Sequence, residues 1–96
     1  MTRTSKAQLQ GLIDRLNLIT NSPSEPYTKT DKGYQANIGN YHLDGAYGGW
    51  KLVRMVSPEG GIQCPISMGY ESKRDCYRMI AAFIAGISQQ QYEERK

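Results

Sequence analysis

The chain has 96 residues, which is enough for one domain with a single hydrophobic core. Its formal net charge of +3 permits an acidic partner but falls well short of the Lys and Arg density of a dedicated nucleic-acid tail. Two cysteines and one histidine are too few for a structural zinc site with four ligands, so we expect no metal and no cofactor.

The first predicted element is an amphipathic helix that begins after Ser5 and ends just before the turn-forming residues 21–23. Ser5 and Gln8 have the spacing of a capping box. Leu18 points away from the apolar face, and Asn17 lies off it among the polar residues. The apolar face itself consists of residues at helical spacing: Leu9, Leu12, Ile13, Leu16 and Ile19.

Residues 21–33 are predicted to form a loop, because proline, serine and charged residues dominate this segment. Tyr27 is the one large apolar side chain in it. We expect Tyr27 to hold the loop against the core of the domain.

Glycine and aromatic residues dominate the chain from Tyr34 onward, with short apolar runs between them. The alternation of residue types predicts three antiparallel strands, at residues 34–38, 41–46 and 50–56. Two-residue hairpin turns are predicted between them, at Gly39-Asn40 and at Gly48-Gly49.

A strong turn signal at residues 57–61 is followed by a further alternating segment, residues 62–68. Pro65 within this segment has no N–H to donate to a sheet ladder, so the segment is predicted to be an edge strand. Cys64 lies on the apolar side of the alternation. We expect Cys64 and Cys76 to be buried, free and reduced thiols.

The last predicted element is a helix that begins after the N-cap residue Ser72. Phe83 lies in the middle of its apolar face and is expected at the centre of the core. Gly86 is predicted to end the helix, so the domain would comprise residues 1–87 and be followed by a polar tail, residues 88–96. The apolar face consists of Cys76, Met79, Ile80, Phe83, Ile84 and Ile87.

This order of elements predicts an α+β domain of two layers. A meander of three or four antiparallel strands would carry an N-terminal and a C-terminal helix on one face. The start of the chain has no apolar signal segment, and no stretch approaches transmembrane length. We therefore expect a cytoplasmic protein with no membrane partner.

Two motifs have the composition of catalytic sites, but neither is complete. His42 and Asp44 face the same side of a strand, as in the orienting half of an acyl-transfer triad, yet no serine or cysteine stands in a nucleophile context. The glycine-rich residues 45–49 lack the lysine and the following helix of a phosphate-binding loop. We therefore predict no enzymatic activity and no catalytic residues.

Three cations lie in the first turns of the last helix: Lys73, Arg74 and Arg78. Cations at this end oppose the helix dipole and contribute nothing to folding. Free backbone N–H groups beside cations suit an anion, which makes an anion or nucleic-acid site one interpretation. A solvated, polar helix start is the other interpretation.

The chain is rich in tyrosine, with seven tyrosines and one tryptophan. Both residue types are enriched at binding surfaces. Tyr41, Tyr47 and Trp50 cluster around two glycine turns, and we expect them to form an exposed surface. Such a surface would bind a protein partner or, equally well, a second copy of the chain in a homodimer. Cross-strand packing that only stabilises the sheet remains the alternative.

The segment from Asn37 to Met55 resembles a family of small uncharacterised proteins encoded by tailed bacteriophages and prophages. The resemblance covers roughly residues 26–87. That family has no assigned activity, so the resemblance implies only context: an accessory phage protein in the bacterial cytoplasm. The resemblance rests on residues 37–50, 52–55, 72–74 and 82–87.

The order helix, three strands, helix is also similar to that of double-stranded-RNA-binding domains. Residues 25–27 and 72–74 are similar to motifs of that family. This resemblance implies contacts between the start of the last helix and a phosphate backbone. Tyr77 stands where a further basic residue is expected, and Glu71 carries the opposite charge.

Two functional hypotheses follow from the sequence. The first is a small non-catalytic phage accessory protein that binds a host or phage protein. The second is a module that binds the backbone of double-stranded RNA or DNA through the start of the last helix.

Overall fold

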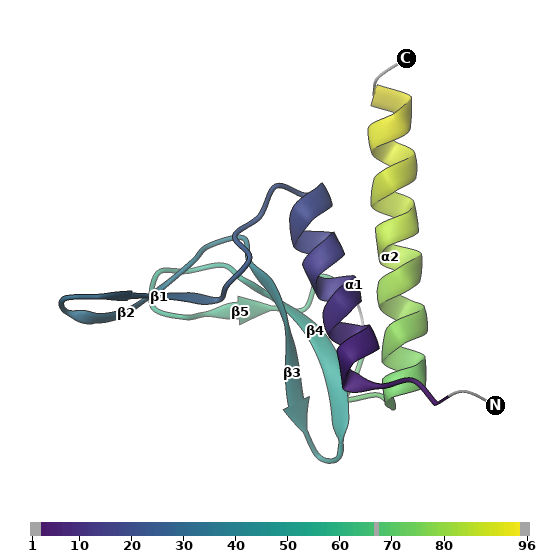
Figure 1. Cartoon of the computed structure of the whole chain (residues 1–96), viewed down its shortest axis with the longest axis horizontal. Coiled ribbons are helices and arrows are strands. Elements are labelled where there is room, and N and C mark those ends of the chain that lie inside the picture. Colours follow the sequence, from purple (N-terminus) through teal and green to yellow (C-terminus); the bar gives the residue numbers. More distant parts are fainter. Residues whose placement is uncertain (1–2, 67, 95–96) are drawn as a thin grey trace.

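The computed structural model describes residues 3–66 and 68–94, in which two helices lie side by side against a three-stranded sheet (Figure 1). The predicted α+β class, with a helix at each end, is confirmed. The elements are α1 (Lys6–Ile19), β1 (Tyr27–Thr30), β2 (Gly33–Ala36), β3 (Tyr41–Ala46), β4 (Gly49–Met55), β5 (Ile62–Gln63) and α2 (Lys73–Glu94).

The hydrophobic core lies between the helices and the sheet that contains β3, β4 and β5. Helix α1 packs on β3, and α2 packs on β4 and along α1. The helices run parallel, so both begin at the same end of the molecule (Figure 1). The largest fully buried side chains of this core cluster are Leu9, Ile13, Leu16, Leu52, Ile80 and Cys76.

Helix α1 begins as predicted, with a complete capping box between Ser5 and Gln8. Leu18 is 80% exposed, which confirms that it points away from the apolar face. The prediction that Asn17 lies off the buried face of this helix was wrong, because Asn17 is only 2% exposed. Its side-chain amide donates to the carbonyl of Tyr41 at 3.0 Å and accepts from the N–H of Tyr41 at 2.8 Å. Asn17 therefore joins α1 to the start of β3.

The predicted loop over residues 21–33 is partly a strand, because β1 lies within it and pairs with β2. The turn at residues 39–40 is consequently not a hairpin turn between neighbouring strands. Strands β1 and β2 instead form a separate two-stranded arm that projects from the body (Figure 1). Tyr27 is 47% exposed, and its hydroxyl lies beside Gly60 rather than in the core.

The β3–β4 turn is shifted by one residue from its predicted position. Tyr47 and Gly48 form the turn, with φ angles of 54° and 73°. Both φ angles are positive, as a type I′ hairpin turn requires. Strand β5 has only two residues and lies at the sheet edge.

The two cysteines differ in exposure, which corrects the prediction that both are buried. Cys64 is exposed, whereas Cys76 is fully buried on the inner face of α2. Burial, reinforced by the nearby Glu71 carboxylate, raises the pKa of the Cys76 thiol to about 11. The Cys76 thiol is therefore protonated at neutral pH and behaves as a small apolar group.

Helix α2 continues through Gly86 to Glu94, so the prediction that Gly86 ends it was wrong. The side chain of Gln91 donates to the Ile19 carbonyl at 2.7 Å, which satisfies one of the free carbonyls at the end of α1. Phe83 is half-buried rather than central to the core. Neither helix of the described chain has an apolar stretch that could span a lipid bilayer.

Candidate functional site

The segment just before α1, the start of α2 and the β3–β4 hairpin surround an open pocket of about 700 Å³. Trp50, from the predicted aromatic set, and Lys73 and Arg74, from the predicted cation set, all line this pocket. The structure therefore unites two sets that the sequence had kept apart. The lining consists of Arg3, Thr4, Gly48, Trp50, Ser72, Lys73 and Arg74.

Trp50 is held at the centre of the site by three contacts. Its cross-strand partner is Gly45, and a Cβ atom at that glycine would lie only 2.8 Å from the Trp50 ring. The ammonium group of Lys6 lies 5.1 Å from the centre of the ring, within the range of a cation–π contact. The backbone of Trp50 exchanges two hydrogen bonds of 2.8 Å with Glu71, which fixes the start of α2 beside the ring.

Each helix presents its positive end to this region. The hydroxyl of Ser5 accepts from the N–H of Gln8 at 3.1 Å, and that of Ser72 accepts from the N–H of Asp75 at 3.2 Å. These caps satisfy one N–H each, and the remaining first-turn N–H groups have no partner within their own helix. Two parallel helix dipoles thus add positive potential at the same end of the molecule.

The cations of the site have no acidic partners within the part of the chain that the structure describes. Arg3, Lys73 and Arg74 form no ion pair or hydrogen bond through their side chains there. The carboxylate of Glu71, just before α2, accepts from the N–H of Gly69 at 3.3 Å instead. Folding therefore leaves the positive charge of the site available to a ligand.

Tyr47 stands at the tip of the hairpin and is 95% exposed. A bulky residue with positive φ is an outlier, because the left-handed conformation brings its Cβ close to the following carbonyl. Its ring makes one edge contact, with Tyr70 at a centroid distance of 5.5 Å. The Tyr47 side chain therefore contributes little to the stability of the fold.

Two other predicted site residues lie elsewhere. Tyr41 is 6% exposed and packs edge-on against Phe83, so it does not belong to the exposed aromatic surface. Arg78 is exposed one turn further along α2 and does not line the pocket.

The His42–Asp44 pair lies on the sheet face away from the helices, and its members bind different partners. Asp44 accepts from the Tyr70 hydroxyl at 2.5 Å, and this hydrogen bond is the main cause that raises the pKa of Tyr70. His42 Nδ1 lies 3.0 Å from the side-chain oxygen of Asn40. Burial lowers the pKa of His42, against the opposing effect of Asp44. Among the described residues, no group of three His, Cys, Asp or Glu side chains could hold a metal ion.

Sequence reasoning did not select Arg3 and Lys6, because nothing in the sequence states that the helices are parallel. A usable signal was nevertheless present: Ser5-Lys6 and Ser72-Lys73 repeat the same cap-and-cation pair at both helix starts.

Comparisons of the chain with protein-family models, with curated proteins and with solved structures found no match.

Proposed function

We propose that this chain is a non-catalytic binding module that holds nucleic acid by its phosphates in the pocket between the helix starts. The observation that carries the proposal is the gathering of Arg3, Lys73, Arg74 and Trp50 around one open pocket, where the cations have no acidic partner within residues 3–66 and 68–94. Tyr47 lies on the hairpin tip beside this pocket and would contact a base.

The cations suit phosphate groups in particular. A guanidinium group offers a planar fork of donors that matches two phosphate oxygens, and Arg3 lines the pocket from the segment before α1 while Arg74 lines it from the first turn of α2. Lys73 adds a compact charge beside them. Free N–H groups in the first turns supply further donors to an anion.

The aromatic side chains favour a nucleic acid over a small free anion. Bases stack on exposed aromatic rings, and a basic groove combined with such rings is typical of proteins that bind unpaired nucleotides. Tyr47 presents a ring that is 95% exposed, and Trp50 lines the pocket itself. Residues 72–74, which resemble a motif of double-stranded-RNA-binding domains, belong to the same site.

A protein partner is the second candidate, and the exposure of Tyr47 favours it. Tyrosine is enriched among interface anchors, and an exposed ring at a hairpin tip suits this role. The resemblance of residues 37–55 to phage proteins supports a setting in the bacterial cytoplasm, where this module would serve as an accessory phage protein.

The test measures the affinity for fluorescently labelled single-stranded and duplex oligonucleotides by anisotropy over a series of salt concentrations. Each phosphate contact releases counterions, so log K should fall with log salt by about 0.7 per contact for single strands and 0.9 for duplexes. Lys73→Gln with Arg74→Gln should lower the slope by about one per lost contact.

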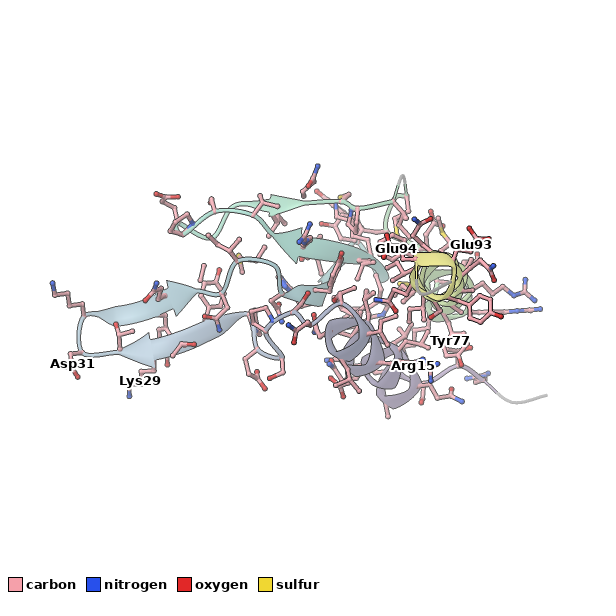
Figure 2. All side chains as sticks on the ribbon, turned by 90° about the horizontal axis from the view of Figure 1, so that it is seen from above. Arg15, Lys29, Asp31, Tyr77, Glu93 and Glu94 are labelled. Carbon is pink, nitrogen blue, oxygen red and sulfur yellow. The ribbon has the colours of Figure 1, made fainter. Side chains whose placement is uncertain are left out.

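A matched control removes the same charge far from the pocket. Arg15→Gln with Lys29→Gln changes one cation on α1 and one at the tip of the arm (Figure 2). This control should keep the salt slope of the wild type. Equal losses in both double variants would show that only net charge matters, and no binding at low salt would eliminate the proposal.

A further inference from the structure

The β1–β2 arm is a two-stranded ribbon, and its strands pack against no other sheet or helix among the described residues. Every residue of both strands is exposed except Ala36. The arm is attached at its base, where the Asn37 side chain bonds to the Glu25 carbonyl at 3.0 Å and to Thr28. An isolated two-stranded hairpin is only marginally stable in water, so a neighbouring strand would stabilise the arm.

Both edges of the arm carry unpaired backbone groups. The Asn37 N–H donates to the Pro26 carbonyl at 2.9 Å, which fixes the alternation of hydrogen bonds along the ribbon. The outward-facing groups are those of Tyr27, Lys29, Tyr34 and Ala36.

Strand β3 also has a free edge. The backbone groups of Trp50 bond to Glu71 and therefore point away from β3. Hydrogen bonds alternate in direction along a strand, so the groups of Tyr41, Leu43 and Gly45 face the open side of β3. The Asn17 side-chain amide already bonds to the backbone N–H and C=O of Tyr41. Within the described chain, Leu43 and Gly45 have no strand beside them.

A groove of about 540 Å³ follows this free edge between β3 and α1. Ile13 and Trp50 provide apolar lining, and Asp14 and Glu25 provide carboxylates. Unpaired N–H and C=O groups at strand spacing beside a groove match an extended backbone, because an added strand supplies both partners.

We propose that a second copy of this chain occupies this groove, with its β1–β2 arm laid along the free edge of β3. The exchange is reciprocal, so each copy gives one arm and receives one. The arm cannot serve its own β3, because β1 and β2 run crosswise to that strand (Figure 1). One contact thus supplies a neighbour to the arm and a partner to the open edge.

Charge complementarity favours the second copy over an unrelated extended peptide. The arm carries Lys29, Asp31 and Lys32, with Lys29 and Asp31 at its far end (Figure 2), which gives a net charge of +1. The charged side chains of the groove are Lys6, Asp14 and Glu25, which give a net charge of −1.

The first test determines the molar mass by sedimentation over a wide range of concentrations, against a monomer of 10.8 kDa. Lys29→Glu with Lys32→Glu should weaken the dimer about tenfold or more, as should Asp14→Lys with Glu25→Lys. All four changes together should restore it. A monomer at every concentration, or a dimer that neither pair of changes weakens, overturns the proposal.

The second test uses the unmodified chain, so it does not depend on the folding of variants. Amide hydrogen exchange is compared between dilute and concentrated protein. The amides of Leu43 and Gly45, together with those along one edge of the arm, should gain protection as concentration rises. Dimerisation that leaves the amides of Leu43 and Gly45 unprotected places the contact elsewhere and overturns the proposal.

Discussion

Asn17 shows how one buried side chain can connect two layers. Its amide takes the place of a neighbouring strand for Tyr41, with one donated and one accepted hydrogen bond. Asn17 thus satisfies the outward-facing backbone groups of Tyr41 at the start of the free β3 edge. It does not reach the backbone groups of the later residues on that edge. Because Asn17 is only 2% exposed, water cannot replace these bonds if the amide is removed.

Asn17→Ala is therefore expected to lower the free energy of unfolding by about 2–4 kcal/mol, from lost hydrogen bonds and an unsatisfied buried N–H and C=O. Urea unfolding followed by circular dichroism measures the loss. Gln10→Ala on the exposed face of α1 is the control and should change stability by less than about 0.5 kcal/mol. Similar effects of the two changes would mean that the amide of Asn17 contributes little.

His42 makes stability depend on pH. Burial, only partly opposed by Asp44, holds the pKa of His42 below its ordinary value of 6.5. On acidification the unfolded chain takes up this proton before the folded one. The contribution of His42 is thus fully present above pH 6.5 and is lost as the pH falls through the folded pKa.

The urea concentration at the unfolding midpoint of the wild type should therefore decrease when the pH is lowered from 7.5 to 5.5, a range that spans the ordinary His pKa of about 6.5. His42→Gln should show a smaller fall, because carboxylates then remain the main titrating groups. An identical pH dependence in both proteins would contradict the assignment to His42.

At the scale of elements, the β3–β4 hairpin combines a favourable glycine with an unfavourable tyrosine. Gly48 accepts its positive φ without cost, whereas Tyr47 has a φ of 54° that asparagine or glycine would adopt more readily. The exposed ring gains only an edge contact with Tyr70 in return. This conflict between local preference and observed residue is typical of functional positions.

Tyr47→Asn should leave the free energy of unfolding unchanged or raise it by up to about 1 kcal/mol, because relief of the left-handed strain offsets the lost ring contact. The same change should weaken oligonucleotide binding about tenfold, since stacking of one base is worth about 1–3 kcal/mol. Tyr47→Phe keeps the ring and should keep the affinity. Unchanged binding by Tyr47→Asn would remove Tyr47 from the site.

The helices could be predicted from the sequence because their apolar spacing is clear, as Leu9, Ile13 and Leu16 show. The sequence also indicated β2, whose residues alternate, but not β1, because residues 27–30 are all exposed and carry no alternation between apolar and polar faces. The continuation of α2 through Gly86 was also not predictable from local signals, because it depends on a distant contact. The Gln91 side chain, beyond Gly86, donates to the Ile19 carbonyl at the end of α1. Local signals indicated Lys73 and Arg74, but only the parallel helices bring Arg3 to them.

At the scale of the whole molecule, the positive charge is concentrated rather than neutralised. No ion pair links side chains in the described parts of the chain, and the net charge is +3. The cations at the two helix starts repel one another and oppose the helix dipoles. The fold therefore depends on its core and hydrogen bonds, and the electrostatic energy of the basic end opposes folding.

Added salt should consequently stabilise this protein, whereas it weakens proteins held together by surface ion pairs. The melting temperature should rise between low and physiological salt, and rise further with phosphate, which can occupy the basic pocket as well as screen it. Phosphate also stabilises folded proteins by exclusion from their surface, so the informative quantity is a difference between variants.

Lys73→Gln with Arg74→Gln should melt at a higher temperature than the wild type at low salt, and its melting temperature should rise less on addition of phosphate. Arg15→Gln with Lys29→Gln should gain as much as the wild type. Equal gains in all three proteins would show that the pocket holds no special excess of positive potential, and the proposed phosphate site would lose its electrostatic basis.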